Sequence, residues 1–320
     1  MKKTCIGLGM VVWVIFFCFP CFAQEKFPNK PIFINVGQGA GGSTDIIARV
    51  LEPFLHKELK SPIVVQNLTG AGGDVVNNFI WKAKPDGYNL VMTVLPSYIV
   101  REQIKKPGFK ILEMSFIYGI AGGDFNAISV PYNSPIKNFS DLKKMASEKT
   151  LSAAGVTPGS NSWFAYILLR ETTGIKFKYV PYDSGTEAAT AAGGGHVDLA
   201  ITSIISAVQP VQNKLIRLIA TFSFKRDPSF PDVPTMVDLG YKDMHFATRQ
   251  GLAGPPKMPK EIVAIIANAA AKAVRDPKFM EIADRQGFTV DPMPASEFHQ
   301  WAVGIYEQAR KVLTTAGEIK

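Results

Sequence analysis

Cysteine is almost absent from this sequence, and its three cysteines all lie within the first 21 residues, at Cys5, Cys18 and Cys21. The rest of the chain therefore has no disulfide, no thiolate metal site and no cysteine nucleophile. Histidine is also scarce. The four histidines show no i, i+4 pair that would hold a metal on one helix face, so we predict no metal site; they are His56, His196, His245 and His299.

Sequence signals of catalysis are lacking as well. There is no Gly-x-Ser-x-Gly nucleophile elbow, and Ser160 has no base near it in the sequence. We therefore predict no catalytic residue and no cofactor, and keep an exported hydrolase or lyase only as an alternative.

Long runs of positive charge are missing, although the net charge is +8. Lys105-Lys106 and Lys143-Lys144 are only pairs, and no aromatic platform accompanies them. A nucleic-acid partner would need a basic stripe or such a platform, so the composition argues against nucleic-acid binding.

The N-terminus has the pattern of an export signal. Lys2 and Lys3 precede an apolar stretch from Ile6 to Phe19, and Cys21-Phe22-Ala23 resembles a signal-peptidase site. The apolar stretch is short for a membrane anchor. Pro20 before Cys21 argues against a lipoprotein. We predict cleavage after Ala23 and a periplasmic protein.

Strands alternate with helices along the remaining chain, which predicts an α/β protein with mostly parallel sheets flanked by helices. The length suits two domains. We expect a signal peptide over 1–23, a first domain over 24–124 and 248–320, and a second domain over 125–247. Expected strands include 88–95, 150–154, 177–180, 197–202 and 215–221, and expected helices include 74–82, 160–172 and 186–192.

A glycine-rich turn, Gly37 to Asp45, follows a predicted strand and precedes a predicted helix with Ser43 or Thr44 as its N-cap. Such a turn allows close approach of a ligand, and the helix start favours an anion. Gly37-x-Gly39-x-x-Gly42 also matches the dinucleotide fingerprint. The export signal opposes that interpretation, and the second strand ends in Asn67 where an acidic residue would bind ribose.

Three further turns of this kind follow predicted strands, at 67–74, 155–162 and 182–186. In open α/β sheets such turns lie at the carboxyl ends of strands, where ligands bind. Four turns split between two halves predict a cleft lined by N–H donors and few charges. Such a cleft suits carboxylates held by neutral hydrogen bonds.

A series of short motifs runs in order along the chain after the export signal. They are Phe27-Pro28-x-Lys30-Pro31-Ile32, Gly39-Ala40-Gly41-Gly42-Ser43-Thr44-Asp45, Gln66-Asn67-x-x-Gly70-Ala71-Gly72-Gly73, Pro85-Asp86-Gly87-Tyr88, Pro158-Gly159-Ser160, Val180-Pro181-Tyr182, Gly195-His196-Val197-Asp198 and Phe230-Pro231-Asp232-Val233-Pro234-Thr235. Through these motifs the chain resembles the solute-binding receptors of tripartite tricarboxylate transporters, the Bug family, over nearly its whole mature length. Leu68-Thr69 and Thr202 depart from the family pattern, which leaves the ligand open.

The resemblance implies a two-domain, type II-like periplasmic binding fold that closes on a small carboxylate. It also implies delivery to membrane subunits, and we expect a monomer. We expect Asn67 and Asp198 to brace loops and Asp183 to cap a helix or interact with its dipole. The expected ligand contacts are Gly39, Ala40, Gly41, Ser43, Thr44, Thr157, Gly159, Ser160, Asn161, Ser184 and Arg249.

Arg249 would lie near the hinge, where its guanidinium could pair with a second or third carboxylate of the ligand. A hinge salt bridge with Asp124 or Asp227 is the alternative. For the whole chain, the receptor of an ABC importer or of a sensor remains an alternative with the same fold.

Overall fold

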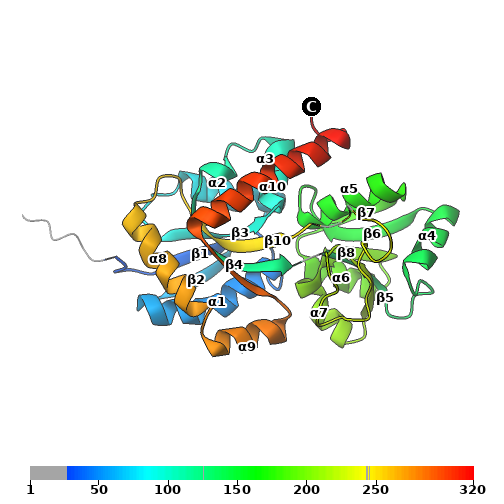
Figure 1. Cartoon of the computed structure of the whole chain (residues 1–320), viewed down its shortest axis with the longest axis horizontal. Coiled ribbons are helices and arrows are strands. Elements are labelled where there is room, and N and C mark those ends of the chain that lie inside the picture. The colour runs from blue at the N-terminus through cyan, green and yellow to red at the C-terminus, as the bar shows by residue number, and fades with distance from the viewer. Residues whose placement is uncertain (1–26, 125, 243, 245) are drawn as a thin grey trace, which may run out of the picture.

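The computed structural model describes residues 27–320 except 125, 243 and 245, and the predicted signal peptide lies outside the described residues. The chain forms two α/β domains, each built on one sheet (Figure 1). The first sheet has the strand order β11-β4-β10-β3-β1-β2, and the second has the order β7-β6-β8-β5-β9.

In the first domain, β1 (Ile32–Val36) pairs in parallel with β2 (Ile63–Asn67) and β3 (Asn89–Leu95). One face of the sheet is covered by α1 (Ser43–Leu59), α8 (Lys260–Ala273) and α9 (Pro277–Gln286). The other face is covered by α2 (Asp74–Lys82), α3 (Ser97–Lys105) and α10 (Ala295–Thr315) (Figure 1). Burial of both faces explains the nearly continuous apolar sequence of these strands.

The second domain packs helices on both faces of its sheet in the same way. Its strands are β5 (Asn126–Pro131), β6 (Leu151–Val156), β7 (Phe177–Tyr182), β8 (Leu199–Ser203) and β9 (Ile216–Thr221). Its helices are α4 (Phe139–Glu148), α5 (Asn161–Thr173), α6 (Gly185–Gly193) and α7 (Ile204–Gln212).

The predicted α/β class is confirmed, but the sheets are mixed rather than mostly parallel. β10 (Thr248–Gly254) returns from the second domain and inserts antiparallel between β3 and β4 (Ser115–Asp124), and β11 (Val290–Pro294) adds a further antiparallel pair. In the second sheet, β5 runs antiparallel to both β8 and β9. The strands that carry the chain between the domains, β4, β5 and β10, therefore run antiparallel to their neighbours.

The chain crosses between the sheets at two adjacent places. β4 ends at Asp124 and β5 begins at Asn126, while β10 begins at Thr248, whose register partner is Asp124. We propose these crossings as the domain limits and as the hinge.

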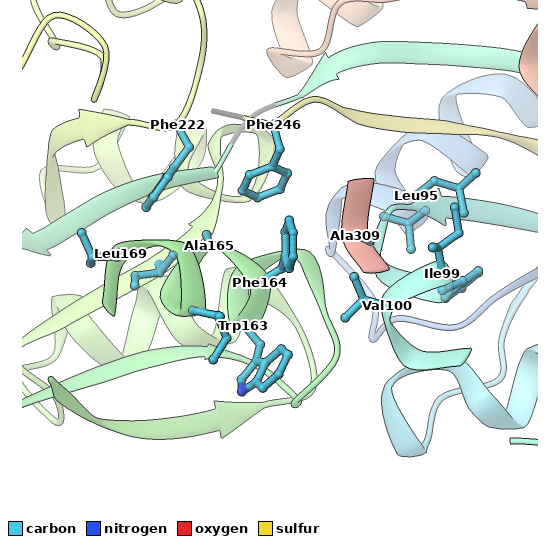
Figure 2. Close-up of a cluster of buried hydrophobic side chains, with 14 of the residues drawn as sticks. Leu95, Ile99, Val100, Trp163, Phe164, Ala165, Leu169, Phe222, Phe246 and Ala309 are labelled. Atoms are coloured by element: carbon cyan, nitrogen blue, oxygen red, sulfur yellow. The ribbon is translucent and has the colours of Figure 1, made fainter. Parts of the chain in front are cut away.

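A cluster of buried apolar side chains includes members of both domains beside the hinge. Within the second domain, Phe164 of α5 packs edge-to-face against Phe246, with ring centroids 5.3 Å apart. Figure 2 shows these rings in the same buried cluster as side chains of β3, α3 and α10 from the first domain. Those side chains are Leu95, Ile99, Val100 and Ala309.

The helices of the C-terminal segment each bury one stripe of apolar side chains. Phe298 of α10 is fully buried, and Trp301, Ile305 and Val312 pack against the same core. On α8, Ile266 is buried, but Ile265 is 39% exposed and lies outside the buried stripe. Within the described residues, no helix is both long and apolar enough to span a membrane.

Candidate functional site

The first glycine-rich turn leads from β1 into α1. The prediction that Ser43 or Thr44 caps α1 is wrong. The N-cap residue is Gly42, which has no side chain that could accept a capping hydrogen bond. The side-chain oxygen of Gln38 instead accepts a hydrogen bond from the Thr44 amide at 3.2 Å. Ser43 is the first helical residue, 4% exposed, and its Oγ lies 3.3 Å from Nε2 of Gln250.

Asp45 holds this turn in shape. Its carboxylate accepts hydrogen bonds from the Gly41 amide at 3.0 Å, from Nδ2 of Asn67 at 2.8 Å and from Arg49 at 2.9 Å. Burial by itself would raise the pKa of Asp45, but these hydrogen bonds outweigh it and the pKa is lowered. Asn67 therefore braces the loop, as expected.

The turns of the second domain use serine caps. Ser160 accepts a hydrogen bond from the Trp163 amide and donates its own proton to the Val156 carbonyl, both at 3.1 Å. Ser184 caps α6 by accepting from the Glu187 amide at 3.2 Å, so Asp183 is not the cap residue.

A further capped turn follows β8, where the sequence has no glycine. Ser203 caps α7 by accepting a hydrogen bond from the Ser206 amide at 3.3 Å, and its hydroxyl donates to Oγ of Ser206 at 3.1 Å. Ser206 is 3% exposed. This turn also reaches the space between the domains.

Two adjoining cavities lie between the domains. The hinge cavity, about 20 Å³, and the loop cavity, about 30 Å³, each leave room for very little beyond one or two water molecules. The hinge cavity is lined by Gln38, Ser43, Val94, Ser97, Asn126, Val156, Ser160, Asn161, Ser162, Gly185, Ser203 and Ser206. The loop cavity is lined by Gly37, Gln38, Thr69, Gly70, Ala71, Gly72, Val94, Ser97, Tyr98, Val156, Thr157, Ser160 and Asp183.

The small volumes reflect direct contact between the domains around these cavities. Thr186 Oγ1 donates to the Gly41 carbonyl at 2.5 Å, and Asn161 Nδ2 donates to Thr248 Oγ1 at 2.9 Å. Both hydrogen bonds join the second domain to the first. The structure is therefore a closed form.

A buried ion pair adds a third link. Arg101 of α3, 6% exposed, forms a bidentate pair with Asp74 at the start of α2. Its Nη1 also donates to the Pro158 carbonyl of the second domain at 2.5 Å. A Cβ at Gly159 would lie 2.5 Å from Cδ of Arg101, so only glycine allows this approach.

Several polar atoms at the cavity walls have no protein partner. Among the described residues these include Asn126 Nδ2, Thr157 Oγ1 and Asn161 Oδ1. Buried polar groups in folded proteins are normally hydrogen-bonded. Their grouping here indicates a polar binding site.

The predicted ligand contacts divide into two groups. Ser43, Thr157, Ser160 and Asn161 line the cavities. Most of the others lie around the cavities. Gly39 and Gly41 approach the start of α6 across the gap between the domains, and Ala40 is exposed to solvent. Thr44 and Ser184 are buried at helix starts, and the Gly159 carbonyl accepts a hydrogen bond from Ser97 Oγ at 3.4 Å.

Arg249 is engaged away from the cavities. Its guanidinium pairs with the Asp291 carboxylate on β11, donates to the Asp291 carbonyl at 3.0 Å and lies 5.4 Å from the Trp301 ring centroid. Alternation along β10 sends Thr248 and Gln250 to the other face, toward Asn161 and Ser43. We therefore remove Arg249 from the proposed contacts. The alternative was a hinge salt bridge with Asp124 or Asp227, but Arg249 pairs with Asp291 instead.

Asp198 braces the opposite end of the second sheet, where it accepts hydrogen bonds from the amide and hydroxyl of Ser152 at 2.8 and 2.7 Å. Six polar residues of the hinge-cavity wall were not among the predicted contacts: Gln38, Ser97, Asn126, Ser162, Ser203 and Ser206. Gln38 and Ser162 lie in glycine-marked turns, whereas no glycine marks the turns that carry Ser97, Ser203 and Ser206. For Ser97 and Ser203, the sequence signal is a serine within two residues of the end of a predicted strand.

Comparison with known proteins decides the family. The sequence profile of the tripartite tricarboxylate transporter family receptor matches residues 47–317. The chain belongs to this receptor family. Relatives of the receptor include the UPF0065 protein in the gbd 5′ region of Cupriavidus necator, 30% identical over 306 residues (94% of this chain, 92% of that one), and the protein BugT of Bordetella pertussis, 26% identical over 305 residues (91% and 93%).

Solved structures agree with the fold of the receptor. The periplasmic binding protein BugD matches with a TM-score of 0.86 at 25% identity, over 92% of this chain and 100% of that chain. MatC from Rhodopseudomonas palustris, with bound malate, matches with a TM-score of 0.84 at 23% identity, over 90% and 100%. An R. palustris protein with adipate matches with a TM-score of 0.86 at 21% identity, over 91% and 98%.

Proposed function

We propose that the receptor captures a small organic carboxylate in the cleft between its domains, with a dicarboxylate or tricarboxylate favoured. It then delivers this ligand to the membrane subunits of a tripartite tricarboxylate-type transporter. The proposed export signal over 1–23 places it in the periplasm, where it acts as a monomer without turning the ligand over.

The observation that carries this proposal is the closed, polar and almost uncharged site at the helix starts of both domains. Thirteen residues line the loop cavity and twelve line the hinge cavity, and Asp183 is the only charged residue among them. Backbone amides at helix starts and serine hydroxyls are donors suited to carboxylate oxygens. The malate and adipate of two structural neighbours are ligands of this chemical class.

A melting-temperature screen tests the proposal. The purified mature protein is heated with succinate, malate, adipate, citrate, acetate and benzoate, each at a concentration well above a micromolar dissociation constant. A ligand present at a hundredfold its dissociation constant stabilises the folded state by about 2.7 kcal/mol. We expect a clear rise in melting temperature with at least one dicarboxylate or tricarboxylate.

Mass spectrometry of the same mixtures separates binding from catalysis. The acid that raises the melting temperature should be recovered unchanged after prolonged incubation. A converted acid would show an enzyme, and no stabilisation by any of these acids would contradict the proposed ligand class.

A further inference from the structure

We propose that the C-terminal segment 316–320 is a latch that holds the two domains in the closed form, through an ion pair between Glu318 and Arg170 of the second domain. The latch lies outside the ligand cleft. It goes beyond the proposed function, because it concerns how long the receptor stays closed and not which acid it binds.

The end of α10 is shaped so that the chain turns back toward the molecule. Gly317 has a φ of +70°, a left-handed conformation that favours glycine, and its amide donates to the Thr314 carbonyl at 3.1 Å. The Glu318 amide donates to the Leu313 carbonyl at 2.9 Å, which completes a Schellman-type helix end. These hydrogen bonds fix the backbone that carries the Glu318 side chain.

The latch is anchored in the first domain by α10. Leu313 is fully buried, and Ile319 is partly buried against the same apolar cluster. Farther back on α10, the Tyr306 carbonyl accepts a hydrogen bond from Nε2 of Gln103 on α3 at 2.8 Å. Figure 1 shows the end of α10 reaching over the gap between the domains toward α5. The latch therefore belongs to the first domain and faces the second.

Arg170 is the partner of the latch in the second domain. It lies in the last turn of α5, and its Nη2 donates to Oε1 of Glu318 at 3.1 Å. Its Nε donates to Oε1 of Glu171 at 2.7 Å, and its guanidinium lies 5.9 Å from the Tyr166 ring centroid. Only 25% of the Arg170 side chain and 29% of the Glu318 side chain are exposed, so salt screens this pair less than a fully exposed one.

The geometry makes this ion pair depend on domain closure. α5 begins at the cavity wall with Asn161, and Arg170 lies about 13 Å farther along the helix axis. When the second domain turns about the hinge, α5 moves with it, while Glu318 stays with the first domain. Opening therefore separates the two charges. A contact made in one of two states shifts the equilibrium toward that state, so the pair favours the closed form.

Stopped-flow kinetics with the acid that binds best in the melting-temperature screen test the latch. Glu318→Gln removes the pair between the domains, while Arg170 keeps Glu171 as an anionic partner. We expect the ligand to dissociate about threefold faster, in line with the modest contribution of a partly exposed ion pair. The association rate should stay nearly the same, because the ligand enters the open form. A dissociation rate equal to that of the wild type would overturn the inference.

Two further variants show whether the ion pair itself is responsible. Arg170→Gln combined with Glu318→Gln should release the ligand no faster than the faster single variant, because either change already removes the contact. Glu113→Gln is the matched control, since it removes an ion pair with Lys110, 2.9 Å long, that lies within the first domain. Additive effects in the double variant, or an equal effect of Glu113→Gln, would overturn the latch.

Hydrogen exchange measures opening without a ligand and keeps the test independent of the proposed function. In the ligand-free protein, amides of the cleft turn at 155–162 should exchange faster in Glu318→Gln than in the wild type or in Glu113→Gln. Unfolding curves check the fold of each variant. Equal exchange in the three proteins would overturn the latch. Failure of every carboxylate to bind would instead overturn the proposed ligand class, and the exchange rates would still decide the latch.

Discussion

Two serine hydroxyls in the same cleft have different roles. Ser160 both accepts and donates within its own turn, because it caps α5 and gives its proton to the Val156 carbonyl. Ser43 caps nothing, and its hydroxyl proton remains available toward the hinge cavity that it lines. Both are predicted ligand donors, and we propose that Ser43 is the direct donor while Ser160 mainly holds its turn.

Alanine substitution of each serine should separate these roles. Ser43→Ala should weaken ligand binding by about 1–2 kcal/mol and leave the unfolding free energy nearly unchanged. Ser160→Ala should lower the unfolding free energy by about 1 kcal/mol through loss of the cap. Calorimetry and denaturant unfolding on both variants measure the two quantities. The opposite pattern would show that Ser160 is the direct donor.

Arg249 should contribute to stability rather than to selectivity. Arg249→Gln removes the ion pair with Asp291 and the cation–π contact with the Trp301 ring, whose centroid lies 5.4 Å from the guanidinium. We expect the unfolding free energy to fall by about 1–2 kcal/mol. The ratio of affinities for dicarboxylates and matching monocarboxylates should stay the same. A selective loss of dicarboxylate affinity would restore Arg249 to the ligand contacts.

At the scale of elements, the predictable part of the site is the set of glycine-marked turns. Gly37 to Asp45 and Pro158 to Ser160 could be predicted because glycine and capping residues mark strand-to-helix turns in the sequence itself. The roles of Ser97, Ser203 and Ser206 in the site could not be predicted from the sequence. Their turns lack glycine, and they meet the other turns only because β3 and β8 end at the same gap between the sheets.

The ion pair of Arg101 with Asp74 links α2, α3 and the Pro158 turn, and its removal should show this coupling. Arg101→Gln should lower the unfolding free energy by about 3 kcal/mol, because it leaves the Asp74 carboxylate partly buried without its cation. Adding Asp74→Asn should recover part of that loss. Denaturant unfolding of both single variants and the double variant measures the coupling, and strictly additive losses would contradict it.

The Asp45 brace of the first turn gives a pH dependence with a defined sign. Its pKa in the folded protein is lowered from 3.8, so the stabilisation is complete above that value and is lost as the pH falls through the folded-state pKa. The pKa of Asp198 in the second domain is also lowered, so that residue contributes to stability with the same sign. The unfolding free energy should therefore fall in the acid range below about pH 4.

Asp45→Asn should flatten this acid slope, because the neutral amide binds no proton in either state. Unfolding free energies of wild type and variant between pH 7 and pH 3 test it. Equal slopes in the two proteins would show that Asp45 does not contribute to the acid sensitivity.

For the whole molecule, the α/β class and the two-domain periplasmic binding fold followed from alternating patterns and from the resemblance, and both are confirmed. The direction of β10 was not predictable, because it depends on where the chain re-enters the first sheet after the second domain. That insertion between β3 and β4 makes the sheet mixed. It also sends Thr248 and Gln250, rather than Arg249, toward the cleft.

The most direct test of the account is a calorimetric titration of the mature protein with the dicarboxylate that most raises its melting temperature. The account predicts one site per chain, an affinity reduced in Ser43→Ala, and an affinity preserved in Arg249→Gln. Absence of binding by any dicarboxylate or tricarboxylate, or an affinity that depends on Arg249 and not on Ser43, would contradict a carboxylate site built from neutral donors at helix starts.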